Sequence, residues 1–133
     1  MNKILDPKDM AILIKNTKCV IIKFSASWCG PCQNEQFKHN YEQLKIGSQK
    51  YNDFIQFIEL DVDDHDDIVS STKYYDFKIS SIPHFKFCFD GNIIKEYNGI
   101  HCLEDILENI NKVIELVMIE RDEQSKKVLD ENT

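Results

Sequence analysis

The sequence predicts an α/β protein, with a central mixed β-sheet of four to five strands flanked by helices on both faces. Three observations support this fold class. Apolar, β-branched runs alternate with helical patterns, a hairpin signal lies in the second half, and an amphipathic helix follows it. The chain of 133 residues, 42% of them hydrophobic, is long enough for one domain with its own core.

The first expected helix spans about Pro7–Lys15. Asp6 is a suitable N-cap, and a proline in the first turn followed by Asp9 is typical of a helix start. A short strand at Lys3–Leu5 would precede this helix and would be the fifth strand of the sheet.

Two buried strands are expected on either side of the next helix. Cys19–Ser25 and Phe54–Leu60 are nearly continuous apolar runs, which is typical of strands covered on both faces in a parallel sheet. Lys23 is the exception in the first run. Between the strands, Gln33–Ile46 favours helix, and Gly47 is the expected helix stop.

An acidic run, residues 61–67, follows the second strand. We interpret it as a solvated loop and an acid-rich helix start rather than a cation site, because it lacks the glycine and the closing glutamate of an EF-hand loop. A short helix at about Asp66–Tyr75 is expected next.

A hairpin and a final helix complete the predicted fold. Phe85–Phe89 and Asn92–Tyr97 are joined by Asp90-Gly91, a turn signal that predicts an antiparallel pair, and Gly99 ends this pair. The final helix has apolar residues at spacings of three and four: Leu103, Ile106, Leu107, Ile110, Val113, Ile114 and Val117. Residues 1–118 therefore form the predicted domain, and residues 119–133 a charged helix end or a flexible tail.

The charge balance argues against some classes of partner. Sixteen basic and 23 acidic residues give a net charge of −7, and such a surface repels phosphate backbones, so we expect no nucleic-acid partner. The first ten residues contain Asp6, Pro7 and Asp9, and no apolar run reaches the length of a membrane span. We therefore expect a soluble, cytoplasmic protein without a membrane partner.

Five cysteines divide into one pair and three single residues. Cys29 and Cys32 form a C-x-x-C pair, whereas Cys19, Cys88 and Cys102 are interpreted as small buried hydrophobes or bystander thiols. A C-x-x-C pair is also half of a zinc site, but the sequence has no second such pair. We therefore expect no metal.

The position of the pair predicts its chemistry. The cysteines lie where a buried strand ends and a helix begins, so free N–H groups and the helix dipole should lower the pKa of Cys29 and make it the nucleophile. Cys32 would lie one turn inside the helix, close enough to bond to Cys29 and more sheltered, as suits a resolving thiol.

Several segments together resemble the thioredoxin family. They are Phe24–Cys32 with its Trp-Cys-Gly-Pro-Cys motif, residues 58–64, residues 77–83 ending in Ile-Pro, the Asp90-Gly91 hairpin and Gly99. The resemblance covers most of the chain from Lys3 to about Val117. It implies a thioredoxin fold and a thiol–disulfide oxidoreductase, most simply a protein-disulfide reductase.

The resemblance also implies roles for the site residues. Cys29 would attack a substrate disulfide and Cys32 would resolve the mixed disulfide. Pro83 would follow a cis peptide bond beside the cysteines, and the backbone of Ile82 would pair with the substrate chain. Trp28 would shield the thiols and contribute to docking.

The resemblance also implies the direction of the reaction and its partners. Gly30 and Pro31 resemble those of the reducing members of the family. The implied partners are disulfide-containing substrate proteins and a thioredoxin reductase that uses NADPH, in electron transport and cell redox homeostasis. No organic cofactor is expected, since the redox centre is the Cys29–Cys32 pair itself.

The sequence departs from the family pattern at Lys23. Thioredoxins usually carry there a buried Asp that is thought to take the proton of the resolving thiol. One hypothesis makes Lys23 a modulator of proton transfer, as a base with lowered pKa or as a cation that favours the thiolates. The alternative, which we favour, is that its stem packs in the sheet while its amine reaches Glu59 or water.

Two other residues depart from the family pattern. Phe37 replaces a proline that commonly kinks the helix after the cysteines, and His84 replaces a Thr after Pro83, which would place an imidazole near the thiols.

Two other functions remain open at this point. One is an oxidant or isomerase that donates its disulfide. The other is a thioredoxin-fold interaction module with little turnover, an alternative that Lys23 keeps open.

Overall fold

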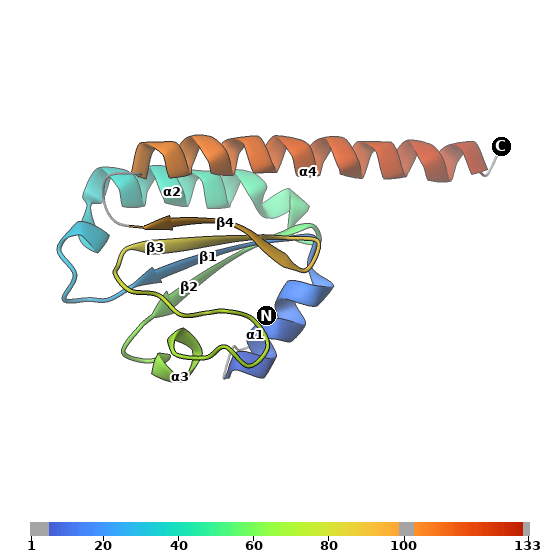
Figure 1. Cartoon of the computed structure of the whole chain (residues 1–133). Coiled ribbons are helices and arrows are strands. Elements are labelled where there is room, and N and C mark those ends of the chain that lie inside the picture. The colour runs from blue at the N-terminus through green and yellow to red at the C-terminus, as the bar shows by residue number, and fades with distance from the viewer. Residues whose placement is uncertain (1–5, 99–102, 132–133) are drawn as a thin grey trace.

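The computed structural model describes residues 6–98 and 103–131. Its elements, in chain order, are α1 (Pro7–Asn16), β1 (Cys19–Ser25), the 3₁₀ turn η1 (Pro31–Gln33), α2 (Glu35–Ser48), the 3₁₀ turn η2 (Gln49–Tyr51), β2 (Ile55–Asp61), α3 (Asp66–Val69), β3 (His84–Phe89), β4 (Asn92–Asn98) and α4 (Leu103–Glu131) (Figure 1).

The four strands form one mixed sheet in the order β2-β1-β3-β4. β1 pairs with β2 in parallel and with β3 antiparallel, and β3 pairs with β4 antiparallel. The predicted fold class is confirmed. The expected strand at Lys3–Leu5 and Gly99 lie outside the described residues.

Helices cover both faces of the sheet, with α2 and α4 on one side and α1 and α3 on the other (Figure 1). Alternate side chains of β1 divide between the two cores, because successive residues of a strand point to opposite faces. Cys19 and Ile21 pack with α2 and α4, whereas Val20 and Ile22 pack with α1 and α3. β1 is therefore the buried centre of the fold, and its carboxyl end leads into the cysteine pair.

The end of α2 differs from the prediction. Gly47 lies inside the helix, which continues to Ser48 and passes directly into η2. The backbone at Gln49 keeps right-handed helical dihedral angles, so the chain needs no left-handed residue at Gly47 to leave the helix. The expected helix stop at Gly47 is wrong.

α3 ends at Val69, whereas the sequence predicts a helix as far as about Tyr75. The predicted helix is therefore wrong in its length. The hydroxyl of Ser70 donates to the carbonyl of Asp66 at 2.7 Å, and the hydroxyl of Ser71 accepts from the amide of Lys73. Such local side-chain bonds compete with helix continuation. The chain then runs without regular structure to Pro83 and buries Phe77 completely on the way.

α4 continues beyond the apolar stripe, and its far end projects past the sheet (Figure 1). Glu120 pairs with Lys18 at 2.7 Å, and Arg121 donates to the carbonyl of Lys50 at 3.2 Å. Residues 119–133 were expected to be either a charged helix end or a flexible tail, and the structure has helix as far as Glu131. The domain boundary at residue 118 stays a prediction. Within the described part of the chain, no helix is both long and apolar enough to cross a membrane.

Candidate active site

Cys29 and Cys32 form a disulfide in the loop that follows β1. Their Cα atoms lie 5.3 Å apart, and only 5% and 3% of the two residues is exposed. Ala26, Val62 and Ile82 pack around the sulfurs. The pair is therefore a redox centre enclosed by apolar side chains, with the ends of β1 and β2 and the chain before β3 all contributing.

The backbone around the pair favours a thiolate at Cys29. The amide of Cys32 donates to Sγ of Cys29 at 3.2 Å, and the amide of Cys29 is itself held by the carbonyl of Ala26 at 3.1 Å. A hydrogen bond to the charged form of a group stabilises that form. A reduced Cys29 that kept this hydrogen bond would have its thiolate form stabilised by it.

The expected place of Cys32 one turn inside the helix is wrong. Cys32 lies in η1, and α2 begins only at Glu35. Asn34 separates the two elements with a ψ of 112°, and its side chain caps α2 by accepting from the amide of Phe37 at 2.9 Å. The amide that donates to Sγ of Cys29 is therefore that of Cys32, which belongs to η1 and not to α2.

A groove of about 300 Å³ lies beside the disulfide. It is lined by Trp28, Val62, Val69, Ile79, Ser80, Ser81 and Ile82. Trp28 is 67% exposed, and its Nε1 donates to the carboxylate of Asp63 at 2.7 Å. The groove therefore joins the active-site loop to the segment that precedes β3.

The structure brings together most of the predicted site residues. The Ile82–Pro83 peptide bond is cis, as expected, and Ile82 packs on the cysteines and lines the groove. Gly30 and Pro31 lie exposed at the start of η1.

Sequence reasoning missed several residues of this site, namely Asn34, Val62, Asp63, Val69, Ile79, Ser80 and Ser81. Asn34 precedes an acidic first turn, which is a recognisable N-cap signal. Asp63 belongs to the acidic run, but nothing in the sequence indicates that it would bind Trp28.

Lys23, on β1, points to the α2 face of the sheet. Its side chain is 4% exposed, and its Nζ lies 3.4 Å from the carboxylate of Glu59 on β2. The rings of Phe37 and Tyr41 lie 5.6 and 5.4 Å from the same nitrogen. Burial and then the charge of Glu59 raise the pKa of Tyr41 far above its usual range, so that hydroxyl stays protonated.

Cys19 and Cys88 are buried free thiols. Burial raises the pKa of Cys19 and of Cys88 to about 12, so both are neutral thiols. Cys102 lies outside the described residues.

His84 packs against the ring of Phe24 and places Nε2 3.0 Å from Glu96. Across the described ranges, no three His, Cys, Asp or Glu side chains are grouped to hold a metal ion.

A four-stranded mixed sheet with this redox pair after its central strand, opposite a cis-proline, defines a thiol–disulfide oxidoreductase of the thioredoxin type. Comparison with known proteins agrees. The family model described as Thioredoxin matches residues 4–112, and the chain belongs to the thioredoxin family.

Relatives and solved structures support the same assignment. Thioredoxin from Callithrix jacchus is 32% identical over 117 residues, which cover 86% of this chain and 100% of that protein. Thioredoxin from Homo sapiens is 34% identical over 97 residues, 73% of this chain and 81% of that protein. The oxidised mitochondrial thioredoxin 3 of Saccharomyces cerevisiae matches with a TM-score of 0.64 and 26% identity over 84% of this chain and 94% of that one.

Proposed function

We propose that this thioredoxin-type oxidoreductase works as a protein-disulfide reductase, with Cys29 and Cys32 as its dithiol. One observation carries the proposal: the Cys29–Cys32 disulfide adjoins an open groove lined by Trp28 and Ile82. A dithiol that donates its electrons to another protein needs such a surface on which the other chain can lie.

The proposed reaction has two steps. The Cys29 thiolate attacks one sulfur of a substrate disulfide, whose S–S bond breaks, and the other substrate sulfur leaves as a thiolate and takes up a proton. The Cys32 thiol then loses its proton and attacks the sulfur of Cys29. The mixed disulfide breaks, the second substrate thiol is released, and the Cys29–Cys32 disulfide forms with the loss of two electrons to the substrate.

The neighbouring residues are assigned to substrate binding. Trp28 supplies an exposed aromatic surface, and the backbone of Ile82, before the cis bond to Pro83, is assigned to pairing with an extended substrate segment. Gly30 and Pro31 present no bulky or charged side chain between the cysteines, so the substrate sulfur can approach Cys29.

For Lys23 we favour packing over proton transfer. Its amine pairs with the carboxylate of Glu59 and lies over the rings of Phe37 and Tyr41. These contacts with β2 and α2 are sufficient to stabilise the buried positive charge. The alternative, in which Lys23 modulates proton transfer at Cys32, makes a different prediction for the pH dependence of the rate.

The partners follow from the reaction. We infer that the oxidised pair is reduced again by a thioredoxin reductase, and that the substrates are proteins with accessible disulfides. The protein itself needs no organic cofactor or metal, since the electrons pass through sulfur alone. A cytoplasmic location fits this function, because reductases of this kind work where thiols are kept reduced and because Cys19 and Cys88 are free thiols. We infer accordingly that the protein acts in electron transport and cell redox homeostasis.

Reduction of insulin in the presence of dithiothreitol tests the proposal. We expect the unaltered protein to accelerate the reaction and Cys29→Ser to abolish the acceleration, because the nucleophile is lost. Cys88→Ala is the matched control, since it removes a free thiol away from the site. Equal rates for the unaltered protein and Cys29→Ser would rule out the reductase and favour an interaction module with little turnover.

A further inference from the structure

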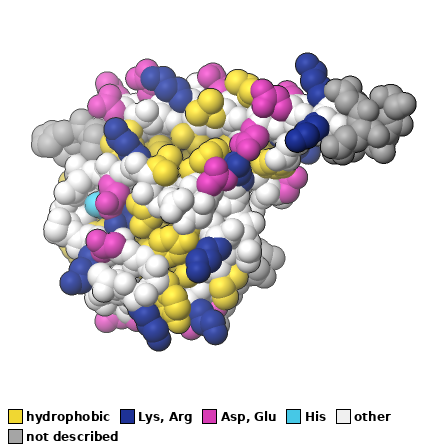
Figure 2. All heavy atoms as spheres, turned by 45° about the vertical axis from the view of Figure 1, so that its right-hand side comes forward, with side chains coloured by type: hydrophobic (Ala, Val, Ile, Leu, Met, Phe, Trp, Pro, Cys, Tyr) yellow, Lys and Arg dark blue, Asp and Glu magenta, His cyan; other side chains and the backbone are white. Residues whose placement is uncertain are grey.

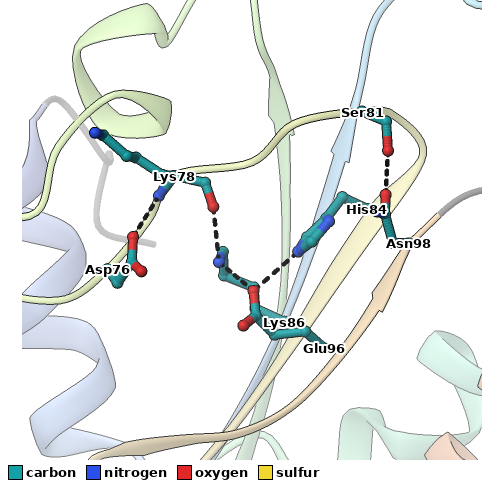
Figure 3. Close-up of polar contacts among 7 residues, drawn as sticks. All are labelled: Asp76, Lys78, Ser81, His84, Lys86, Glu96 and Asn98. Atoms are coloured by element: carbon teal, nitrogen blue, oxygen red, sulfur yellow. Dashed lines mark hydrogen bonds and ion pairs between the residues drawn. The ribbon is translucent and has the colours of Figure 1, made fainter.

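A buried ammonium group lies behind the segment that forms one wall of the groove. Lys86, on β3, has a side chain that is 1% exposed. Its Nζ donates to the carbonyl of Lys78 at 3.2 Å and also to the carboxylate of Glu96 on β4. His84 places Nε2 3.0 Å from the same carboxylate oxygen, so two basic side chains of β3 converge on one acid (Figure 3).

The segment held in this way is irregular and borders the active site. Lys78 immediately precedes the four consecutive groove residues that end at Ile82. Side-chain hydrogen bonds hold this stretch at both ends: the amide of Lys78 binds Asp76 at 3.2 Å, its carbonyl binds Lys86, and Ser81 binds Asn98 (Figure 3). The wall of the groove is thus fastened to β3 and β4 by polar side chains.

Stability alone does not explain this arrangement. Burying an ammonium is costly, and apolar side chains of similar volume often serve a core as well or better than an ion pair. An apolar side chain at position 86 would, however, leave the carbonyl of Lys78 without this donor. The function that only the lysine performs is therefore to fix one backbone atom next to the groove.

We propose that Lys86, held by Glu96, is a positioning residue that sets the conformation of residues 79–83 and so determines how well a substrate polypeptide docks. The proposal rests on the proposed reductase function. It assigns Lys86 no contact with the reacting sulfurs, so the chemistry at Cys29 should proceed without it.

Two variants and a control test the proposal. Lys86→Met removes the donor and leaves Glu96 in place. The double variant Lys86→Met/Glu96→Leu removes both charges of the ion pair, so it guards against misfolding caused by an unpaired carboxylate in the single variant. Lys95→Met is the matched control, since it makes the same substitution at an exposed lysine on β4.

The first readout is cleavage by trypsin after Lys78, whose carbonyl is the atom that Lys86 holds. Cleavage after Lys38, inside α2, reports global unfolding. We expect both Lys86 variants to raise the ratio of the Lys78 to the Lys38 cleavage rate by about tenfold, because only the local opening becomes easier. Lys95→Met should leave the ratio unchanged.

The second readout separates docking from chemistry. We expect both Lys86 variants to raise KM for insulin by about tenfold while kcat stays within about twofold, and the rate with bis(2-hydroxyethyl) disulfide to stay unchanged. An unchanged cleavage ratio, an unchanged KM, or an equal loss of rate with both disulfides would overturn the proposal. If the unaltered chain reduced the small disulfide but no protein disulfide, the reductase function would fail, while the cleavage ratio would still decide whether Lys86 fixes the segment.

Discussion

At the scale of single residues, hydrogen bonding at sulfur separates the described cysteines into two kinds. Cys29 and Cys32 are as buried as Cys19 and Cys88, so exposure does not distinguish them. What distinguishes Cys29 is the amide of Cys32, which donates to its sulfur, whereas desolvation raises the pKa of Cys19 and Cys88 to about 12. A backbone donor at the sulfur, rather than exposure, therefore distinguishes Cys29 from the two buried free thiols.

Lys23 tests whether a buried charge on β1 takes part in the reaction. We expect Lys23→Met to leave the pH profile of insulin reduction unchanged, because the contacts of the amine are with Glu59 and two rings. The thioether side chain should fill the same space, so the free energy of unfolding should change by less than about 2 kcal/mol. Measurement of the rate across the pH range decides: a shifted profile would give Lys23 the proton-transfer role.

Glu96 gives the hairpin of β3 and β4 a dependence on pH. Burial alone would raise the pKa of Glu96, but hydrogen bonds from Lys86 and His84 outweigh it, and the pKa lies below the usual 4.5. The stability that Glu96 contributes is therefore fully present above pH 4.5 and is lost as the pH falls through the lower pKa of the folded state.

Chemical denaturation of the unaltered protein and Glu96→Gln at a series of pH values checks this expectation. The difference in unfolding free energy between the two should be constant above pH 4.5 and shrink on acidification below it. A difference that stays constant through the acid range would show that the carboxylate is not stabilised in the folded state.

At the scale of elements, the continuation of α4 is anchored by Arg121. Its guanidinium donates to the carbonyl of Lys50 and lies 5.2 Å from the ring centre of Tyr51 and 6.0 Å from that of Phe54. We expect Arg121→Ala to lower the free energy of unfolding by about 1 kcal/mol, through the lost stacking and hydrogen bond. Lys126→Ala, at an exposed position on the same helix, should have no measurable effect, and equal losses for the two would show that Arg121 does not anchor the helix.

The elements also show what the sequence could and could not predict. Strands and helices with strong periodic patterns were predictable to within a residue or two, as at Cys19–Ser25 and the start of α1. Helix boundaries that are set by side-chain hydrogen bonds to the backbone were not predictable from the sequence. Asn34 separates the cysteines from α2, and the hydroxyls after α3 end that helix early, both through local bonds that override a helix-favouring composition.

The candidate site divides in the same way. The Cys29–Cys32 pair and the cis bond before Pro83 were predictable because contiguous motifs carry them. The bond from Trp28 to Asp63 and the contact from Lys86 to Lys78 join residues that are distant or unpatterned in the sequence. Such contacts become visible only once the strands are placed side by side.

At the scale of the whole molecule, the sheet brings distant segments to one edge. The carboxyl ends of the parallel strands β1 and β2 lead to the cysteines and to Val62, and the chain entering β3 completes the groove. On the face shown in Figure 2, lysine and arginine side chains are interspersed with acidic ones, so the net charge of −7 is not gathered there into one patch. The groove itself is lined mainly by apolar side chains, so docking there is expected to depend on shape and apolar contact.

The equilibrium redox potential of the Cys29–Cys32 pair tests the central claim most directly. It is measured by titrating the protein with mixtures of reduced and oxidised dithiothreitol and quantifying the free thiols that form. A protein-disulfide reductase of the thioredoxin type should have a potential near about −270 mV, so that its dithiol readily gives up electrons. A potential near about −120 mV, typical of a strong disulfide donor, would contradict the reductase and establish the oxidant.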